Sequence, residues 1–416
     1  MKKKALLFVF IGNLLAVPIV GQVRIDLSLK NAIEQSLANN PQIRAASEGV
    51  NLQKAQFWRA IAPTSPTVSV NYAFVPPAQK LDAFSERTVE VSQSLDFPTT
   101  IFLRGSQALK QIRVAEEEYA SARNEIIART TIAYFNVLAK TERLALSQEN
   151  RAVAEEFARK SAIRRNVGEG TNLEQLTANV QQAQARNAVE TAANELRLVK
   201  GELGLLIGIK NEVDRTHLVL TDSLGFLPRS SDLDRLVETA QLSNAQIRAS
   251  MIKREVASTG YTLAWTSFLP TLSVSYLRQT RDGITGLYGA SFGISIPLWF
   301  MLDHRGQIQS ASAMLAMADH ELEWTKNSVT HGIRSAHFEK VNSEQQLRSY
   351  ESDVLHQSGE IFRSAKASYE AGEISYLEFL QARQTVVQAR SSYIDLLLAY
   401  HVAVAKLEQA VGSSLK

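Results

Sequence analysis

Two glutamates follow hydroxyl residues at the same spacing in two distant parts of the chain. Glu174 lies three residues after Thr171, and Glu378 lies three residues after Ser375. This is the capping-box pattern, in which both side chains bind free backbone N–H groups at the start of a helix. It predicts that a helix begins after Thr171 and another after Ser375. The carboxylates are then plain helix caps, favoured by the helix dipole, or acidic groups presented at a helix tip, and the two roles can coexist.

Other side chains that could carry chemistry are few and scattered. The absence of cysteine excludes disulfides, thiolate metal sites and a lipid-modified N-terminal cysteine. The seven histidines are dispersed, and His331 and His337 are six residues apart, a spacing that does not place them on one helix face. The chain has no strand–glycine loop–helix phosphate site and no His-Glu-x-x-His zinc motif. We therefore expect no catalytic residue, no metal and no cofactor, and an enzyme is the weakest hypothesis.

The two glutamates belong to a repeat that covers most of the chain. Three groups of residues recur 204 positions later, a spacing too long for a solenoid and too regular for chance. The first group is Asn40, Gln42, Ile43, Arg44 and Ala45, with Asn244, Gln246, Ile247, Arg248 and Ala249; the second is Pro66, Thr67, Ser69, Val70 and Tyr72, with Pro270, Thr271, Ser273, Val274 and Tyr276; the third is Gly168, Glu169, Leu173, Glu174 and Leu176, with Gly372, Glu373, Leu377, Glu378 and Leu380. We place repeat one at about 23–220 and repeat two at about 231–416.

The N-terminus has the plan of a secretory signal peptide. Three lysines precede an apolar run from Ala5 to Leu15 that is too short for a membrane-spanning helix, and small residues follow. We therefore expect a signal peptide at residues 1–21 and a mature chain at residues 22–416. The chain has 45 basic and 42 acidic residues, so loss of the three lysines makes the mature chain neutral and argues against nucleic-acid binding. With no long apolar segment, the exported protein is either soluble outside the cytoplasm or a membrane β-barrel.

Each repeat begins with a helix and continues with two strands. The first helix shows apolar residues at helical spacing and ends before Pro63 and Pro66, and its copy ends before Pro270. The strands alternate strictly between apolar residues and small or polar ones, as membrane barrels do. The same alternation occurs in a half-buried strand of a soluble sandwich. Only four such strands occur, in two hairpins separated by helical sequence, which favours the membrane. We expect these residues to face lipid: Val68, Val70, Tyr72, Val274, Tyr276, Phe292 and Ile294.

A very long helix follows each pair of strands. Residues 106–167 contain no glycine or proline, and about 62 helical residues would extend about 93 Å. In the copy, from about 306 to 371, Gly332 and Gly359 are candidate bends. A return helix then ends near Gly208 or Gly412. These helices are rich in Ala, Ser, Gln and Asn, so they can pack closely side by side while the other face stays wet, as in the wall of a tube.

Four strands with a lipid-facing side cannot close a barrel alone, because membrane barrels begin at about eight strands. Open strand edges in lipid leave backbone groups unpaired at a cost of several kcal/mol each. The barrel must therefore be shared between copies of the chain, and the arithmetic permits two copies or three.

Over essentially the whole mature chain, the sequence resembles the outer membrane efflux protein (TolC) family. The markers are Leu-Ser-Leu-x-x-Ala-Ile from Leu27, Asn-Asn-Pro-x-Ile from Asn39, and the paired turns. The most specific one is Tyr369-x-x-Gly372-x-x-Ser375-x-x-Glu378, followed by Leu380. Aromatic residues toward the expected strand ends fit an interfacial girdle; they are Tyr72, Phe74, Phe97, Tyr276 and Trp299.

The resemblance implies a mostly α fold with a small membrane β part. Two tandem repeats of helix, β-hairpin, long helix and return helix would form a homotrimer, with a 12-stranded β-barrel in outer-membrane lipid continued by an α-helical barrel across the periplasm. It implies an exit duct that docks on a periplasmic adaptor protein and an inner-membrane efflux pump or exporter. The tip and gate residues would be Gly168, Thr171, Glu174, Tyr369, Gly372, Ser375, Glu378 and Gln381.

Two departures from the family pattern bear on the gate. Arg165 stands where an aromatic residue would precede Gly168, and Gln381 stands where a second acid often follows Glu378. The cargo stays open between drug, metal ion and polypeptide. A periplasmic coiled-coil scaffold or adhesin without a pore is the alternative function, and such a protein would be extracted without detergent.

Overall fold

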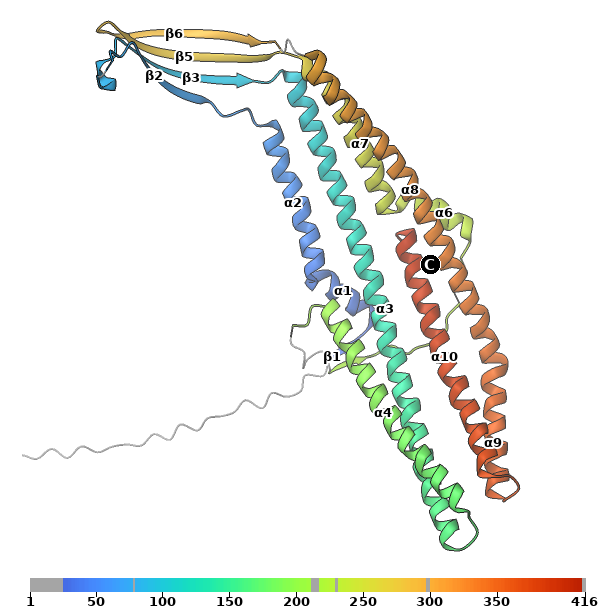
Figure 1. The fold of residues 1–416 in the computed structure, drawn as a ribbon. Helices are drawn as coiled ribbons and strands as arrows, with labels where there is room; N and C mark the ends of the chain where they lie inside the picture. The colour runs from blue at the N-terminus through green and yellow to red at the C-terminus, as the bar shows by residue number, and fades with distance from the viewer. Residues whose placement is uncertain (1–24, 78, 211–216, 229–230, 297–299, 414–416) are drawn as a thin grey trace, which may run out of the picture.

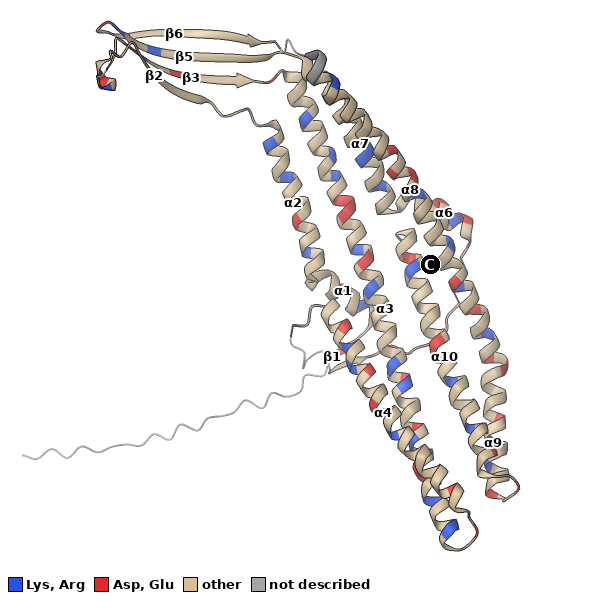
Figure 2. Ribbon diagram, in the orientation of Figure 1, with Lys and Arg blue, Asp and Glu red and all other residues tan. Residues whose placement is uncertain are grey.

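The computed structural model describes residues 25–77, 79–210, 217–228, 231–296 and 300–413. The expected signal peptide and Trp299 lie outside these residues. The molecule is long and narrow, with a small β-sheet at one end and the turns of two helical hairpins at the other (Figure 1). Charges of both signs are distributed along the helices, whereas the sheet carries few (Figure 2). None of the described helices combines the length and apolar character needed to span a bilayer.

The opening helix of each repeat is broken into two, contrary to the single helix that the spacing predicts. The first pair is α1 (Leu29–Asn39) and α2 (Pro41–Ile61), and the second is α6 (Leu233–Ser243) and α7 (Ala245–Trp265). The breaks lie at Asn40 and Asn244, whose side chains accept from the backbone N–H of Gln42 and Gln246. Each asparagine is extended and caps the second helix, which a continuous periodicity does not reveal.

The sheet has four antiparallel strands, β2 (Thr67–Ala73), β3 (Glu86–Leu95), β5 (Thr271–Arg281) and β6 (Ile284–Ser295), in the order β2-β3-β5-β6. The central β3–β5 pairing joins the first half of the chain to the second. Two aromatic residues expected at strand ends lie outside the strands: Phe74 has a φ of 55°, and Phe97 is the residue before α3 (Pro98–Asn166).

The strand register gathers the expected lipid-facing residues on one face. Opposed residues share a face, and the register pairs Val68 with Val91, Val91 with Tyr276, and Val274 with Phe292. The other face carries Ser275 and Ser291, whose hydroxyl oxygens lie 2.7 Å apart. All seven expected lipid-facing side chains are at least 40% exposed in the single chain: Val68, Val70, Tyr72, Val274, Tyr276, Phe292 and Ile294. The sheet therefore presents an uncovered apolar face and a polar one.

Two long helical hairpins descend from the sheet. In the first, α3 returns through α4 (Asn172–Leu206). In the second, α8 (Phe300–Ser349), a π-helical turn (Tyr350–Val354) and α9 (Leu355–Glu370) return through α10 (Tyr376–Val411). The interruption of the second descending helix is this π turn, and it coincides with neither candidate glycine. Inside α3, a side chain at Gly105 would meet Ile61 at 3.0 Å, so this glycine lets α2 pack closely.

A small core lies halfway along the molecule, where the repeats meet. Strand β1 (Ile25–Leu27) pairs in parallel with β4 (Leu218–Leu220), which follows the first hairpin. Beneath this pair, the fully buried Tyr134 donates from its hydroxyl to Asp222 at 2.7 Å. Burial and the facing carboxylate raise the pKa of Tyr134 well above its usual range, so the phenol stays protonated. The buried residues of this core come from β1, α1, α3, α4 and β4, so it holds the first hairpin to the short parallel pair of strands.

Candidate functional site

The turns at the hairpin tips are built alike. Gly168 follows α3 with a φ of 83°, and Gly372 follows α9 with a φ of 78°. A Cβ atom at either position would have nothing within 4 Å. Glycine is therefore required here by the left-handed backbone alone and not by crowding within the chain.

The two glutamates after these turns have different environments. Glu378 completes the predicted capping box, since its carboxylate accepts from Ser375 N at 2.8 Å and Ser375 Oγ accepts from Glu378 N. These hydrogen bonds with Ser375 hold the pKa of Glu378 below its usual value. Thr171 accepts from Glu174 N at 3.1 Å, but the Glu174 carboxylate accepts from another residue, Tyr369. The prediction of a second capping box is therefore wrong for one of its two hydrogen bonds, because the Glu174 carboxylate binds Tyr369 in place of the Thr171 backbone N–H.

Tyr369 links the two hairpins at their tips. Its hydroxyl, at the end of α9, donates to Glu174 Oε1 on α4 at 2.7 Å. Arg164 on α3 donates to the same hydroxyl at 3.4 Å, lies over the tyrosine ring, and is 3.8 Å from Glu174. Burial, and then the hydrogen bond to Glu174, raise the pKa of Tyr369 to about 12, so the phenol is protonated when it meets the carboxylate. Tyr369 and Glu174, predicted separately as tip residues, thus form one contact.

An aromatic cluster packs beside this contact. Phe157 of α3 stacks on Phe379 of α10 with ring centres 4.2 Å apart, and Tyr369 and Tyr376 complete the group. All four side chains are at most 9% exposed. The cluster gives the tip an apolar anchor that also bridges the hairpins.

Polar contacts between α3 and α10 continue the interface between the two hairpins. Glu149 pairs with Arg390 at 2.6 Å, and Arg143 pairs with Asp395. Between the tip and these pairs, Arg383 is only 7% exposed and donates to the backbone and side-chain oxygens of Asn150. Burial lowers the pKa of Arg383 from its usual value. This interface between the hairpins thus combines surface ion pairs with the buried guanidinium of Arg383.

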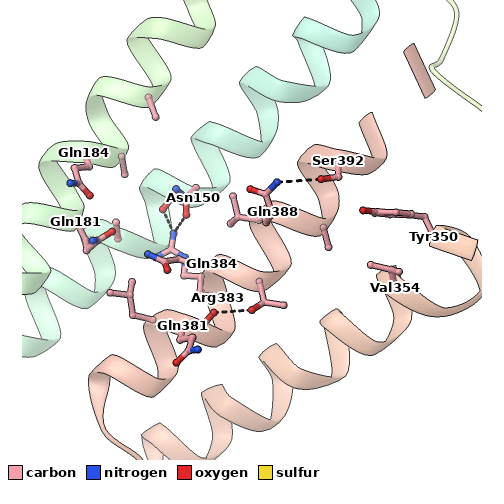
Figure 3. Close-up of a pocket in the computed structure, with 17 residues that line it drawn as sticks. Asn150, Gln181, Gln184, Tyr350, Val354, Gln381, Arg383, Gln384, Gln388 and Ser392 are labelled. Atoms are coloured by element: carbon pink, nitrogen blue, oxygen red, sulfur yellow. Dashed lines mark hydrogen bonds between the residues drawn. The ribbon is translucent and has the colours of Figure 1, made fainter. Parts of the chain in front are cut away.

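Next to Arg383 is a cavity of about 820 Å³ (Figure 3). Amide side chains from α4 and α10 line much of it, and no carboxylate is among its described lining residues. Gln381, the position where the family often has a second acid, belongs to this lining. The amide groups in it are Asn150, Gln181, Gln184, Gln381, Gln384 and Gln388. The cavity therefore combines amide groups with apolar side chains, and its described lining offers no acidic group.

The sequence contains one hydrolase-like pattern, and its residues lack catalytic geometry. Gly289 to Gly293 reads Gly-Ala-Ser-Phe-Gly, which matches Gly-x-Ser-x-Gly. A nucleophile elbow requires a sharp strand-to-helix turn, whereas these residues lie within β6. Ser291 contacts the hydroxyl of Ser275, and among the described residues no base binds it. The glycines are small strand positions.

Comparison with known proteins identifies the family. The sequence model of the outer membrane efflux protein family matches residues 32–208 and 236–413. The chain belongs to the outer membrane efflux protein family. It is 23% identical over 386 residues to the cobalt-zinc-cadmium resistance protein CzcC of Cupriavidus metallidurans, covering 93% of this chain and 90% of that one. It is 21% identical over 423 residues to the outer membrane protein TolC of Escherichia coli, covering 93% and 82%.

Solved structures show the same fold. The CmeC outer membrane channel of Campylobacter jejuni aligns with a TM-score of 0.80 at 18% identity, covering 93% of this chain and 86% of that one. A membrane protein from Pseudomonas aeruginosa aligns with a TM-score of 0.79 at 20% identity, covering 93% and 90%. As an outer membrane efflux protein, the chain resides in the outer membrane and extends into the periplasm.

The structure adds residues to the candidate site of this efflux protein that sequence reasoning missed. Arg164 lies outside the motif around Gly168, whereas Arg165, the residue at the motif position, donates to Gln175. Asn150 and Arg383 come from different repeats, and no local pattern pairs them. The roles of the tip residues as a gate stay a prediction.

Proposed function

We propose that this protein is a passive exit duct of a tripartite efflux system. An inner-membrane pump and a periplasmic adaptor would supply cargo and energy, and the chain itself would perform no catalysis. The observation that supports this most is that one chain joins two kinds of element. A sheet with an uncovered apolar face is connected to two long, narrow helical hairpins. Family membership supports the efflux role.

The duct is a homotrimer in this proposal. Strands β2 and β6 each have only one neighbour in the described sheet, so each leaves one edge open. In lipid, such an edge costs several kcal/mol for every unpaired backbone group. Pairing β2 of one copy with β6 of the next removes both edges, and three copies give a 12-stranded barrel. The apolar face would then meet outer-membrane lipid, and the polar face would line the lumen.

The tips form the closed, adaptor-binding end in this proposal. Three copies would gather six turns in one ring. The contact of Tyr369 with Glu174 and Arg164 would tie the hairpins together in the closed state, and Gly168 and Gly372 would allow a partner to approach the backbone closely. Carboxylates gathered in a narrow pore favour cations and repel anions. Thr171, Ser375 and Gln381 complete the tip.

Planar-bilayer recordings of the purified protein test the duct and its gate. The wild type should form a detergent-dependent, heat-sensitive oligomer with a small, cation-preferring conductance. Replacing Glu174 and Glu378 together by Ala should raise the conductance and weaken the cation preference. If the double variant matches the wild type in both respects, the gate lies elsewhere.

A periplasmic scaffold or adhesin remains the rival function, because long helical hairpins also suit a coiled-coil connector. The apolar sheet argues against it. A monodisperse monomer extracted without detergent, with no channel activity, would support the scaffold and overturn the duct.

A further inference from the structure

Two arginines lie on the apolar face of the sheet. Arg278 of β5 pairs with Val89 on β3 and with Tyr288 on β6. Arg87 of β3 pairs with Tyr72 on β2. Since opposed residues share a face, both arginines belong to the face that carries the proposed lipid-facing residues. This is unexpected, because charge on a lipid-facing surface is costly near the middle of the bilayer.

Their position along the strands resolves the conflict. On β3, the apolar face runs from Leu95 beside α3 to Arg87 at the opposite end. This is about 26 Å along the strand, or roughly 20 Å across a bilayer after the usual tilt, close to the height of the apolar band of a barrel. The arginines therefore lie at the rim farthest from the periplasmic helices, which is the outer leaflet. Tyr288 and Tyr72 beside them suit the interface as well.

The described residues do not neutralise these two charges. Both side chains are exposed, and the structure gives neither an ion pair with a described residue. Arg87 lies over the ring of Phe84, with 5.7 Å between its guanidinium carbon and the ring centre. The acids of β3, Glu86 and Glu90, alternate onto the other face of the sheet. No aspartate or glutamate lies on the apolar face of the described strands.

We propose that Arg87 and Arg278 together bind the phosphate groups of an outer-leaflet lipid. They are diagonal neighbours on adjacent strands, about 7–8 Å apart at the backbone, where two like charges repel unless an anion lies between them. The guanidinium fork matches phosphate in a bidentate manner, and a long side chain can reach from the rim to the headgroups. The inference rests on the proposed contact of this face with lipid.

The test compares lipids that differ only in phosphate. The full mature protein is reconstituted into nanodiscs, and binding of bisphosphorylated lipid A is measured against dephosphorylated lipid A by native mass spectrometry. The wild type should prefer the phosphorylated form, and R87Q/R278Q should weaken that binding at least about tenfold. R281Q is the matched control, because Arg281 is close by on β5 but already pairs with Asp282 at 3.7 Å. It should bind like the wild type.

The outcomes separate this proposal from the exit duct. If R87Q/R278Q does not fold, R87K/R278K takes its place, and it should retain part of the preference because charge is kept while the fork is lost. A wild type that enters nanodiscs but binds both lipids equally overturns the phosphate site and leaves the duct intact. Equal loss in R281Q and R87Q/R278Q also overturns it, because the effect would then be general charge. Failure of the wild type to enter nanodiscs would count against the duct.

Discussion

Single residues explain why two equivalent glutamates differ. Glu378 caps its own helix, whereas Glu174 accepts a hydrogen bond from the other hairpin. The repeat offset places Arg165 at the position of Tyr369, so the first turn has no phenol to offer to Glu378. The repeat thus keeps the turn but makes the cross-hairpin contact only once in each chain.

Tyr369→Phe should loosen the tip. The change removes the hydrogen bond to the Glu174 carboxylate and keeps the ring in its cluster. Hydrogen bonds to charged groups contribute about 1.5–3 kcal/mol, so the open fraction of a gate held by this bond should rise about tenfold or more. Single-channel conductance in planar bilayers measures the effect. Tyr393→Phe is the control, because Tyr393 donates to Glu351 at 2.7 Å within the second hairpin; equal effects of both changes would exclude a special role for the tip contact.

The same contact predicts how the gate responds to pH. The pKa of Tyr369 rises from 10.0 to about 12 on folding. A raised pKa means that the stabilising contribution is fully present below about pH 10 and is lost as the pH rises toward 12. Wild-type conductance should therefore stay constant between pH 7 and pH 9 in bilayer recordings. An increase within that range would assign the gate to a different titrating group.

At the scale of elements, one side chain joins the ends of two helices. Asn40 caps α2 through its oxygen, and its amide nitrogen donates to the carbonyl of Leu206 at the end of α4, at 3.0 Å. Asn244 does the same for α7 and for Ala410 near the end of α10, at 2.8 Å. These contacts hold the end of each return helix against the opening helix pair of the same repeat.

Asn40→Ala should destabilise the protein by about 2–4 kcal/mol. The loss combines an N-cap of about 1 kcal/mol with a buried carbonyl left unpaired at about 1–3 kcal/mol. Asp232→Ala is the control, because Asp232 caps α6 at the surface and its other described contact is an exposed ion pair with Arg235 at 3.4 Å, so the change should cost about 1 kcal/mol. Thermal unfolding followed by circular dichroism compares the two. Equal costs would show that the bond to Leu206 contributes nothing.

The two faces of the strands should differ in how well they tolerate an added charge. Val70→Arg places a charge on the proposed lipid face and should cost roughly 2–4 kcal/mol near the bilayer midplane, falling toward the interface. Ser69→Arg, one residue earlier on the other face, should cost much less. Folding into lipid vesicles from urea measures both. Similar damage from both variants would mean that the apolar face does not meet lipid.

The whole molecule has little core of its own. It is an elongated wall with a small core in the middle and at the tip, and the sheet has two open edges (Figure 1). A chain of this shape leaves large apolar side chains exposed on its helices, among them Trp58, Trp324 and Phe338. Assembly with further copies would cover such surfaces, which is consistent with the proposed trimer.

Disulfide cross-linking can count the copies, because the chain has no native cysteine. Cysteine pairs placed one on β2 and one on β6 should form ladders that end at a trimer on denaturing gels. Ser94 and Ser273 are opposed on β3 and β5 within one chain, so S94C/S273C should cross-link without increasing mass. Ladders that continue beyond three, or only monomer from every β2–β6 pair, would contradict the closed trimer.

The sequence alone determined what depends on neighbours close along the chain. Period-two alternation located all four strands, the lack of breakers located the long helices, and Gly372 with Ser375 and Glu378 located a turn and its cap. Each of these signals depends on residues that are neighbours along the chain, where backbone preference and side-chain alternation determine the structure. Only the tertiary structure decided which distant groups meet. It placed the amides of Asn40 and Asn244 against carbonyls at the ends of α4 and α10, and it paired Glu174 with Tyr369, 195 residues later in the chain. Such contacts depend on how the hairpins pack, and no local pattern records that packing.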